Sequence, residues 1–234
     1  MPVILESWRY FLLGTYPQGP IGGLILTVYL GVYTGATALA IGLTLGSMSL
    51  VPFPPIRWIA RVLVMLVRGI PSLVFLFWMY FLLPRLTGID LSPFQSLSIG
   101  LAVYHGSYMA EDIRGGIQAV HRGQREAGYA TGLGGLNILH HIILPQAVRA
   151  IIPALVNRFV TLFMYTSVVA LFGVLDFMRI GVLLNDRSLI YPMQIFGFVG
   201  AVYFCFSYGL TRLGRKLEKR WQWAPKVHSF DTAV

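Results

Sequence analysis

Long apolar segments follow one another along this chain, and they limit its fold more than any other feature. Five of them are long enough to cross the roughly 30 Å hydrocarbon core of a bilayer. Lipid offers no hydrogen-bond partners, so such segments must form helices or a closed barrel, and the short alternating strands of a barrel are missing. We therefore expect an all-α membrane protein with five transmembrane helices. The segments are residues 21–48, 59–83, 91–110, 150–175 and 188–211.

The overall composition indicates the same class of protein. The chain has 234 residues, of which 56% are hydrophobic and 12% charged, whereas about 25% of a typical soluble domain is charged. The net charge is +9, but the basic residues flank the apolar segments, as membrane topology requires. We therefore expect contact with lipid and no contact with nucleic acid. The single cysteine, Cys205, excludes an internal disulfide and a cysteine metal site.

The distribution of basic residues predicts the orientation. Arginines gather after the first and third apolar segments, and lysines and arginines follow the fifth. Positively charged loops stay in the cytoplasm, which puts the N-terminus outside, the C-terminus inside and residues 114–149 in the cytoplasm. We expect residues 1–20 to lie in the outer interface, residues 21–211 to form the membrane domain, and residues 212–234 to form a basic cytoplasmic tail. That tail either anchors on anionic lipid or contacts a partner subunit.

A polar, glycine-rich stretch interrupts the apolar pattern at residues 121–146. Its glycines break any long helix, and they allow a short helix over residues 124–131 that Gly132 would end. The stretch resembles the EAA loop in the membrane subunit of bacterial ABC importers, from which it departs where Gly128 replaces the third alanine. The resemblance implies a short cytoplasmic helix that docks on an ATPase. The residues that match the motif are Glu126, Ala127, Gly128, Gly132, Ile142, Leu144 and Pro145.

Polar side chains within the apolar segments form a second candidate site, because they are costly in lipid and mark pathways or partner contacts. Arg68 belongs to an Arg-Gly-x-Pro sequence that resembles one in polar amino-acid permeases. It either lines a cavity where Gly69 and Pro71 break the helix, or reaches back to the cytoplasmic surface. Arg158 either meets an anionic substrate group or pairs within the helix bundle. The resemblance places the substrate pathway among Arg68, His105, Asn157, Arg158, Thr166 and Ser167.

Two further stretches resemble the same family with local departures. Residues 110–116 match its Ala-Glu-x-x-Arg-Gly-Gly sequence, in which Glu111 and Arg114 lie on one helix face, but Asp112 stands where the family usually has an apolar residue. The family also carries a Lys-Asp pair on its translocation path, and this chain has Met164 and Tyr165 there. The loss of that pair implies a less polar pathway, or charges supplied by a second permease subunit.

Taken together, about residues 22–220 resemble the permease subunits of polar amino-acid uptake ABC importers, in the branch for histidine, glutamine, glutamate and arginine. The resemblance implies a type I ABC importer-like fold in the bacterial inner membrane. It implies as partners a second permease subunit (the same or homologous), a cytoplasmic ABC ATPase dimer, and a periplasmic or lipoprotein binding protein that delivers an amino acid. The chain has no Gly-x-x-x-x-Gly-Lys-[Ser/Thr] phosphate loop, so ATP and Mg belong to the ATPase. We expect no catalytic residue, metal site or cofactor in this chain itself.

Two other classes of protein remain open from the sequence. A membrane-embedded enzyme could use His105, Glu111 and Asp112, although no catalytic triad or metal set is visible. An ion-coupled carrier or channel predicts broken half-helices in two symmetric halves, which the sequence lacks. Copurification with an ATPase separates all three classes. The amino acid carried, and the choice between homodimer and heterodimer, stay open.

Overall fold

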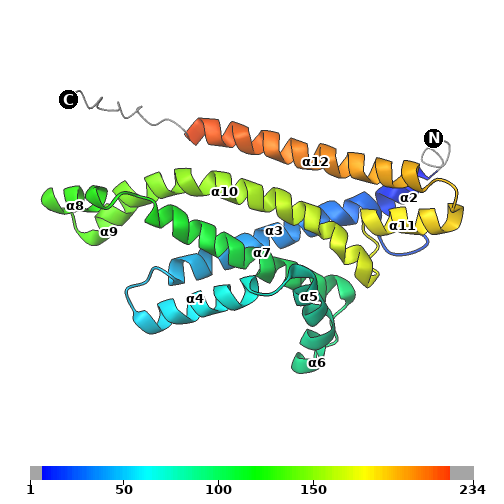
Figure 1. Cartoon of the computed structure of the whole chain (residues 1–234), viewed down its shortest axis with the longest axis horizontal. Coiled ribbons are helices and arrows are strands. Elements are labelled where there is room, and N and C mark those ends of the chain that lie inside the picture. Colours follow the sequence, from blue (N-terminus) through cyan, green and yellow to red (C-terminus); the bar gives the residue numbers. More distant parts are fainter. Residues whose placement is uncertain (1–6, 222–234) are drawn as a thin grey trace.

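The computed structural model describes residues 7–221. Apart from two isolated β-bridges, the regular structure of these residues is helical, as predicted. The short helices α2 (Trp8–Leu13) and α11 (Phe177–Ser188) lie together at one end of a bundle, and α8 (Arg122–Ala130) lies at the other (Figure 1). The long helices that connect the two ends are α3 (Gly23–Met48), α7 (Pro93–Gln118), α10 (Leu144–Tyr165) and α12 (Pro192–Trp221).

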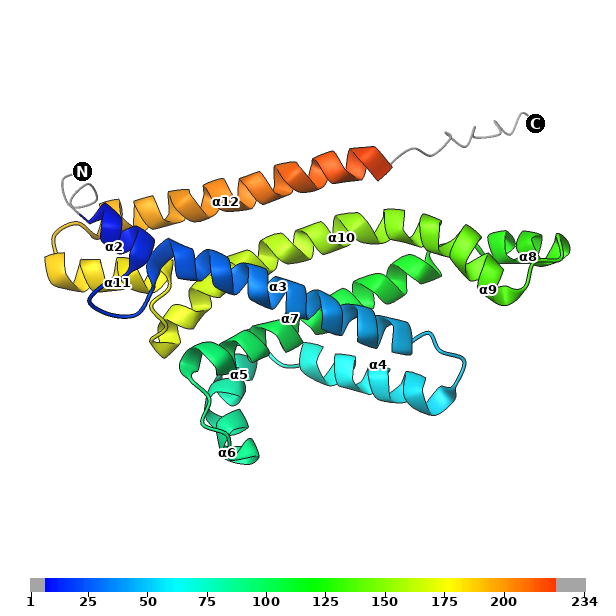
Figure 2. The same cartoon turned by 180° about the vertical axis from the view of Figure 1, so that it is seen from behind.

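The helix α7 packs against three neighbours, α3, α10 and α4 (Pro54–Arg68) (Figures 1 and 2). Small residues let α3 and α7 approach closely. A methyl group added at Gly42 would lie 2.6 Å from Cβ of Met109, and one added at Gly106 would lie 2.8 Å from Cγ2 of Ile41. Both glycines are therefore required where the two helices cross.

Composition supports fewer membrane spans than the five that the sequence predicts. Within residues 7–221, three helical segments are long and apolar enough to cross a membrane, and one bent pair of helices makes a fourth. The helix α7, predicted as residues 91–110, has 26 residues but is not among them. Its buried face carries Ser96, His105 and Ser107, and neighbouring helices rather than lipid surround these polar groups. The three segments are Gly23–Met48, Gly135–Phe172 and Pro192–Leu217.

The second apolar segment, predicted as residues 59–83, is broken near Gly69 and Pro71, where the sequence places an interruption of the helix. The helix α4 ends at Arg68, and the axis turns by 103° before the chain continues to Thr87. Pro71 lacks a backbone donor and disfavours helical geometry at the residue before it, so the helix stops here. Beyond the break, the segment first packs against α7, its last part points away from the bundle (Figure 1), and Arg68 stands at the corner. The later elements are α5 (Ser72–Phe77), a π-helical turn (Trp78–Leu82) and α6 (Leu83–Thr87).

The fourth segment begins earlier than the predicted residues 150–175. A helical run starts at Gly135 and ends at Phe172. It comprises α9 (Gly135–Ile138), a π-helical turn (Leu139–Ile143), α10 and a 3₁₀ turn (Thr166–Phe172). The downstream half of the polar stretch therefore belongs to a helix rather than a loop. Pro145 lies in the first turn of α10, where its missing donor does little harm.

The fifth segment and the start of the tail form one helix. The predicted residues 188–211 correspond to α12, which begins at Pro192 and continues to Trp221. Lysine and arginine are good helix formers, and Arg212 Nε donates to the hydroxyl of Tyr208, one turn earlier, at 2.9 Å. The helix thus shows no boundary at residue 212. Residues 222–234 of the predicted tail lie outside the described residues.

Apolar side chains join α2 to α11 and α12 at the end opposite α8. Phe11 is 2% exposed, and its ring centroid lies 5.5 Å from that of Phe177. Asp176 caps α11 by accepting from two backbone N–H groups of its first turn, and burial raises the pKa of this carboxyl to about 7. The contacts of Phe11 hold α2 on the bundle. An interfacial position for residues 1–20 stays a prediction, and residues 1–6 lie outside the described part.

Reporter fusions test the predicted orientation. We expect a reporter inserted at Asp90, between α6 and α7, to be active outside the cell, because basic residues keep their own loops in the cytoplasm. A reporter fused after Val234 is expected to be active in the cytoplasm. Alkaline phosphatase and a fluorescent protein, placed in turn at each position, report the two compartments. Cytoplasmic activity at Asp90 contradicts the orientation.

Candidate functional site

The polar stretch forms a short exposed helix, α8, at one end of the bundle (Figure 1). The Nδ1 atom of His121 accepts a hydrogen bond from the N–H of Gly123 at 3.1 Å. This cap satisfies one of the free donors in the first helical turn. The helix therefore begins at Arg122, two residues before the predicted start.

Gly132 ends α8, as the sequence predicts. Its φ is +78°, in the left-handed region that favours glycine. The N–H of Gly132 donates to the carbonyl of Tyr129 at 2.9 Å, and the N–H of Leu133 donates to the carbonyl of Gly128 at 3.2 Å. These two bonds make a Schellman cap, so the turn from α8 into α9 depends on a glycine at this position.

The two halves of the motif pack against each other. Gly128 is the buried residue of α8, and a methyl group there would lie 2.8 Å from Cγ1 of Ile138 and 3.1 Å from Cδ1 of Ile142. Glycine in place of the motif's usual alanine lets α8 lie this close. Gln146 also donates to Gln124 at 3.2 Å, which ties the start of α8 to the first turn of α10.

We expect Gly128→Leu to lift α8 from α9, because overpacking costs about 1–3 kcal/mol. Limited trypsin digestion of the purified protein in lipid nanodiscs measures this as faster cleavage after Arg122 or Arg125. Ala127→Leu is the matched control, since Ala127 is exposed and takes the same side chain one residue earlier. Equal cleavage of the two variants contradicts the packing described for Gly128.

The surface of α8 and α9 is exposed and partly apolar. Glu126 and Ala127 are exposed, and Tyr129 and Leu136 leave 56% and 75% of their surfaces open. Exposed apolar side chains that gather at one place are typical of a protein contact. The sequence analysis missed Tyr129 and Leu136, although large apolar residues inside a polar stretch could have indicated them.

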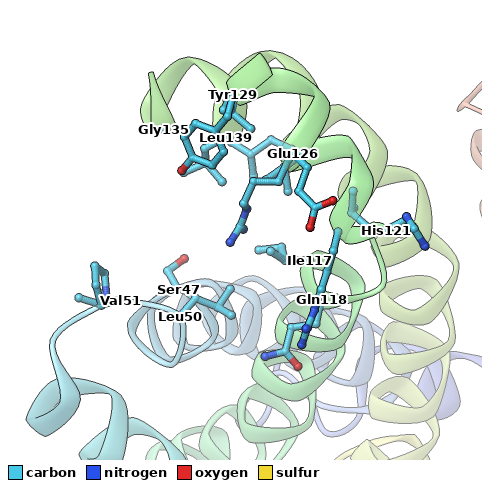
Figure 3. A pocket seen from close by; sticks show the side chains of 17 residues that line it. Ser47, Leu50, Val51, Ile117, Gln118, His121, Glu126, Tyr129, Gly135 and Leu139 are labelled. Carbon is cyan, nitrogen blue, oxygen red and sulfur yellow. The ribbon is translucent and has the colours of Figure 1, made fainter. Parts of the chain in front are cut away.

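A hollow of about 1220 Å³ lies behind α8, between the ends of α3 and α7 and the α8–α9 hairpin (Figure 3). Leu50, Ile117 and Leu139 supply apolar walls from these three elements. Leu144, a predicted motif residue, also lines it. Glu126 borders this hollow as well as the outer surface (Figure 3). Its charged lining residues are Arg122, Arg125 and Glu126.

A second group of charged residues lies farther along the bundle. Arg158 on α10 donates from Nε to Oδ2 of Asp112 on α7 at 2.7 Å, and from Nη2 to Oδ1 at 3.4 Å. In this structure Arg158 therefore pairs within the helix bundle, which is one of the two interpretations that the sequence left open for it. The two unusual residues, Asp112 and Arg158, compensate each other, because a guanidinium within a membrane protein needs a partner.

Tyr108 lies between this pair and the corner of α4. The guanidinium carbon of Arg158 is 4.7 Å from the centroid of its ring, and that of Arg68 is 4.9 Å from it. Nη1 of Arg68 also lies 3.8 Å from Oε2 of Glu111, and Glu111 accepts two hydrogen bonds from Arg114. One aromatic ring therefore links α4, α7 and α10. The sequence analysis missed Tyr108, whose only signal is its place on the same helix face as Glu111.

A pocket of about 560 Å³ opens between α4 and α7 beside this group. Its polar lining residues are Arg61, Arg68, Tyr108, Glu111 and Arg114. The other five predicted pathway residues do not line it. Arg158 pairs with Asp112 as described above, and each of the remaining four has surroundings of its own.

His105 is 2% exposed and its ring lies between those of Tyr104 and Tyr165. Thr166 is buried and donates to the carbonyl of Phe163. Ser167 donates to the carbonyl of Met164 at 2.7 Å, and Asn157 is exposed on α10. The structure therefore gathers Arg68 and Arg158 around Tyr108 and leaves these other residues apart.

Comparison with known proteins identifies the family. The family described as binding-protein-dependent transport system inner membrane component matches residues 38–222. The probable glutamine ABC transporter permease protein GlnM of Bacillus subtilis (strain 168) is 33% identical over 201 residues, or 84% of this chain and 92% of the relative. The glutamate/aspartate import permease protein GltK of Escherichia coli O6:H1 is 32% identical over 207 residues, or 86% of this chain and 92% of the relative.

A solved structure of an amino acid ABC transporter with histidines has the same fold. It superposes with a TM-score of 0.81 and is 28% identical, and the match covers 93% of this chain and 98% of that chain. Family, relatives and fold agree with the motif that the α8–α10 region carries. The chain therefore belongs to the binding-protein-dependent transport system inner membrane components, as a permease subunit of the amino-acid ABC importer type.

Proposed function

We propose that this permease subunit conducts an amino acid across the bacterial inner membrane and takes its driving force from an ATPase bound at α8. A second permease subunit, the same or homologous, completes the pathway. A binding protein delivers the amino acid from outside, and the ATPase dimer holds the ATP and Mg. The relatives named for glutamine and for glutamate and aspartate support an amino acid as the substrate class.

The connection between α8 and α10 carries this proposal. The exposed helix α8 rests on α9 through Gly128, and α9 continues into α10 as one helical run that ends at Phe172. The run is helical throughout although Pro145 and Pro153 each remove one backbone donor, and its remaining backbone hydrogen bonds allow a displacement to pass along it. Movement of a partner against α8 would therefore shift α10, which carries Arg158 beside Tyr108.

Copurification tests the proposal. The tagged permease, expressed together with its ATPase and binding protein, is expected to retain the ATPase in detergent. The complex in proteoliposomes is expected to hydrolyse ATP faster when the loaded binding protein is added. Uptake that follows an ion gradient and proceeds without an ATPase would instead support an ion-coupled carrier. The absence of both ATPase retention and ATP-driven uptake contradicts the proposal.

The substrate pathway is proposed to pass the pocket between α4 and α7. This pocket has open space next to charged side chains, and charged side chains within a membrane protein often mark a functional site. Arg68 belongs to it directly. Arg158 supports it from behind, by holding Tyr108 and Asp112 in place. The burial of His105 and Thr166 supports a role in packing for these two predicted pathway residues.

A further inference from the structure

The last turns of α12 carry exposed lysines and arginines on one side of the helix. Their spacings of three and four residues place them on a single face, which we call the basic stripe. Its members are Arg212, Arg215, Lys216 and Lys219. None of them forms an ion pair with another side chain that the structure describes. Within α12 the sequence has one acidic residue, Glu218, so the stripe has a surplus of positive charge.

The basic stripe points away from the bundle. The helix α12 runs beside α10 on the outside of the bundle (Figures 1 and 2). Gly214 is buried, and a methyl group there would collide with Val156 of α10, so this side of the helix faces α10. Two residues make about half a helical turn. Arg212 and Lys216, two positions to either side of Gly214, therefore lie on the opposite side.

The length of α12 sets the depth of the stripe in the membrane. The segment Pro192–Leu217 is apolar enough to cross the membrane. A helix rises about 1.5 Å per residue, so about 20 residues cross the hydrocarbon core of roughly 30 Å. Counted from Pro192, the core ends near Arg212, where the stripe begins. The stripe therefore lies at the level of the lipid headgroups, on the cytoplasmic side in the predicted orientation.

The surroundings of the stripe suit lipid better than a protein partner. Only 11% of the most apolar part of α12 is buried inside the protein. Next to the stripe, Leu213 and Leu217 expose 59% and 49% of their surfaces. Basic side chains beside leucines match a lipid, which has both a phosphate and acyl chains. The described end of α12 also stops short of α8 (Figure 1), so the stripe and the proposed ATPase site lie at different levels of the bundle.

We propose that the basic stripe binds the phosphate groups of anionic phospholipids in the cytoplasmic leaflet, while the two leucines beside it contact the acyl chains. Anionic lipids of this leaflet attract basic segments that lie close to the membrane. For the region after residue 211, the sequence left a choice between anionic lipid and a partner subunit. The outward direction of the stripe and its depth favour the lipid. The binding of lipid here does not depend on the substrate or on the ATPase.

The native cysteine provides a probe for this contact. Cys205 is the single cysteine of the chain and is exposed. It lies nearly two helical turns before Arg212 and therefore on the same side of α12. The full-length permease is purified, labelled there with a fluorophore, and placed in nanodiscs of zwitterionic lipid. Increasing fractions of brominated phosphatidylglycerol, or of brominated phosphatidylcholine with the same acyl chains, then quench the label.

We expect the anionic lipid to quench half of the fluorescence at an about fivefold lower fraction than the zwitterionic lipid, because one basic residue near an anionic surface contributes about that factor. The triple variant Arg215→Gln, Lys216→Gln, Lys219→Gln is expected to remove this difference, and glutamine preserves the helix. A matched control removes three positive charges from other helices and is expected to keep the full difference. Its changes are Arg9→Gln, Arg57→Gln and Arg85→Gln.

Two results overturn the proposal. One is equal quenching by the two lipids in the unchanged protein. The other is a preference for the anionic lipid that the triple variant keeps. The amount of ATPase recovered with each tagged variant is measured alongside. If the triple variant keeps the lipid preference and loses the ATPase, the stripe contacts a partner protein instead of lipid.

Discussion

Replacing Gly132 by valine is expected to remove most ATP-driven uptake while the protein still inserts in the membrane. Gly132 has a φ of +78°, and a left-handed conformation costs about 1–2 kcal/mol for a residue with a side chain and more for a β-branched one. The Schellman cap would open, so α8 would lose its fixed position on α9. The apolar helices are unaffected, since no side chain lies within 4 Å of the position.

The measurement is the amount of ATPase recovered with the tagged permease, together with hydrolysis stimulated by the binding protein. Gly134→Ser is the matched control. Gly134 lies two residues further on, has a φ of −70° and no neighbour within 4 Å of an added side chain, and serine is favoured at its helix-start position. Wild-type ATPase recovery and hydrolysis in Gly132→Val would refute the proposed docking role of α8.

A change of charge at Glu126 is expected to act on the same step by a different route. Glu126 lines the hollow behind α8 (Figure 3), and Arg122 and Arg125 line the same hollow. In Glu126→Lys three positive groups would face one another, and repulsion of like charges on one short helix opposes docking. We expect a loss of recovered ATPase. Asp186→Lys makes the same change in net charge on α11, at the other end of the bundle, and is expected to leave recovery unchanged.

The motif and its local geometry were accessible from the sequence because they depend on neighbours in the chain. The end of α8 at Gly132 depends on a bond from Gly132 to the residue three positions before it and on one from Leu133 to the residue five positions before Leu133, and such a pattern leaves a fixed glycine in the sequence. Glu111 and Arg114 pair across one helical turn for the same reason. The position of Gly128 against Ile138 likewise follows from a hairpin only a few residues long.

Contacts between distant segments were less accessible. Asp112 and Arg158 are 46 positions apart. Asp112 was noticed as a departure from a resemblance, and Arg158 as a charged side chain within an apolar segment. Neither observation identifies the other residue as the partner until the helices are placed. The helix α7 was predicted by apolarity, yet it holds His105 and Ser107 in its buried face. Hydropathy measures how well a segment suits a lipid environment. It is therefore a poor guide to a helix that other helices enclose.

The bend after Arg68 shows a similar limit. Arg68-Gly69-Ile70-Pro71 predicts a break, because proline and glycine interrupt helices. The size of the turn, 103°, depends on how α5 packs against α7, through contacts such as the 5.8 Å separation between the ring centroids of Phe75 and Tyr104. A local sequence pattern gives the place of a break, and tertiary packing gives its direction.

Removal of one partner of the Asp112–Arg158 pair is expected to destabilise the bundle strongly. The Arg158→Ala variant leaves the Asp112 side chain, which is 17% exposed, without its partner. It also removes the cation–π contact between Arg158 and the ring of Tyr108. Breaking a fully buried pair costs about 3–5 kcal/mol, and the partial exposure of both groups reduces this to about 2 kcal/mol. We expect a melting temperature several degrees lower for the purified protein, and weaker expression.

A double variant separates a packing role from a role in transport. In Asp112→Leu with Arg158→Leu no charge is left unpaired, and apolar residues of similar size often replace an ion pair without loss of stability. We expect the free energy of unfolding to return to within about 1 kcal/mol of the wild-type value, and the melting temperature to rise accordingly. Uptake is expected to return as well, since the pair holds α7 to α10 and does not line the pocket beside Arg68. Melting temperature and the initial rate of ATP-driven uptake are measured on the same proteoliposome preparations. A double variant that is stable, retains its ATPase and yet fails to transport would show that Arg158 meets the substrate directly.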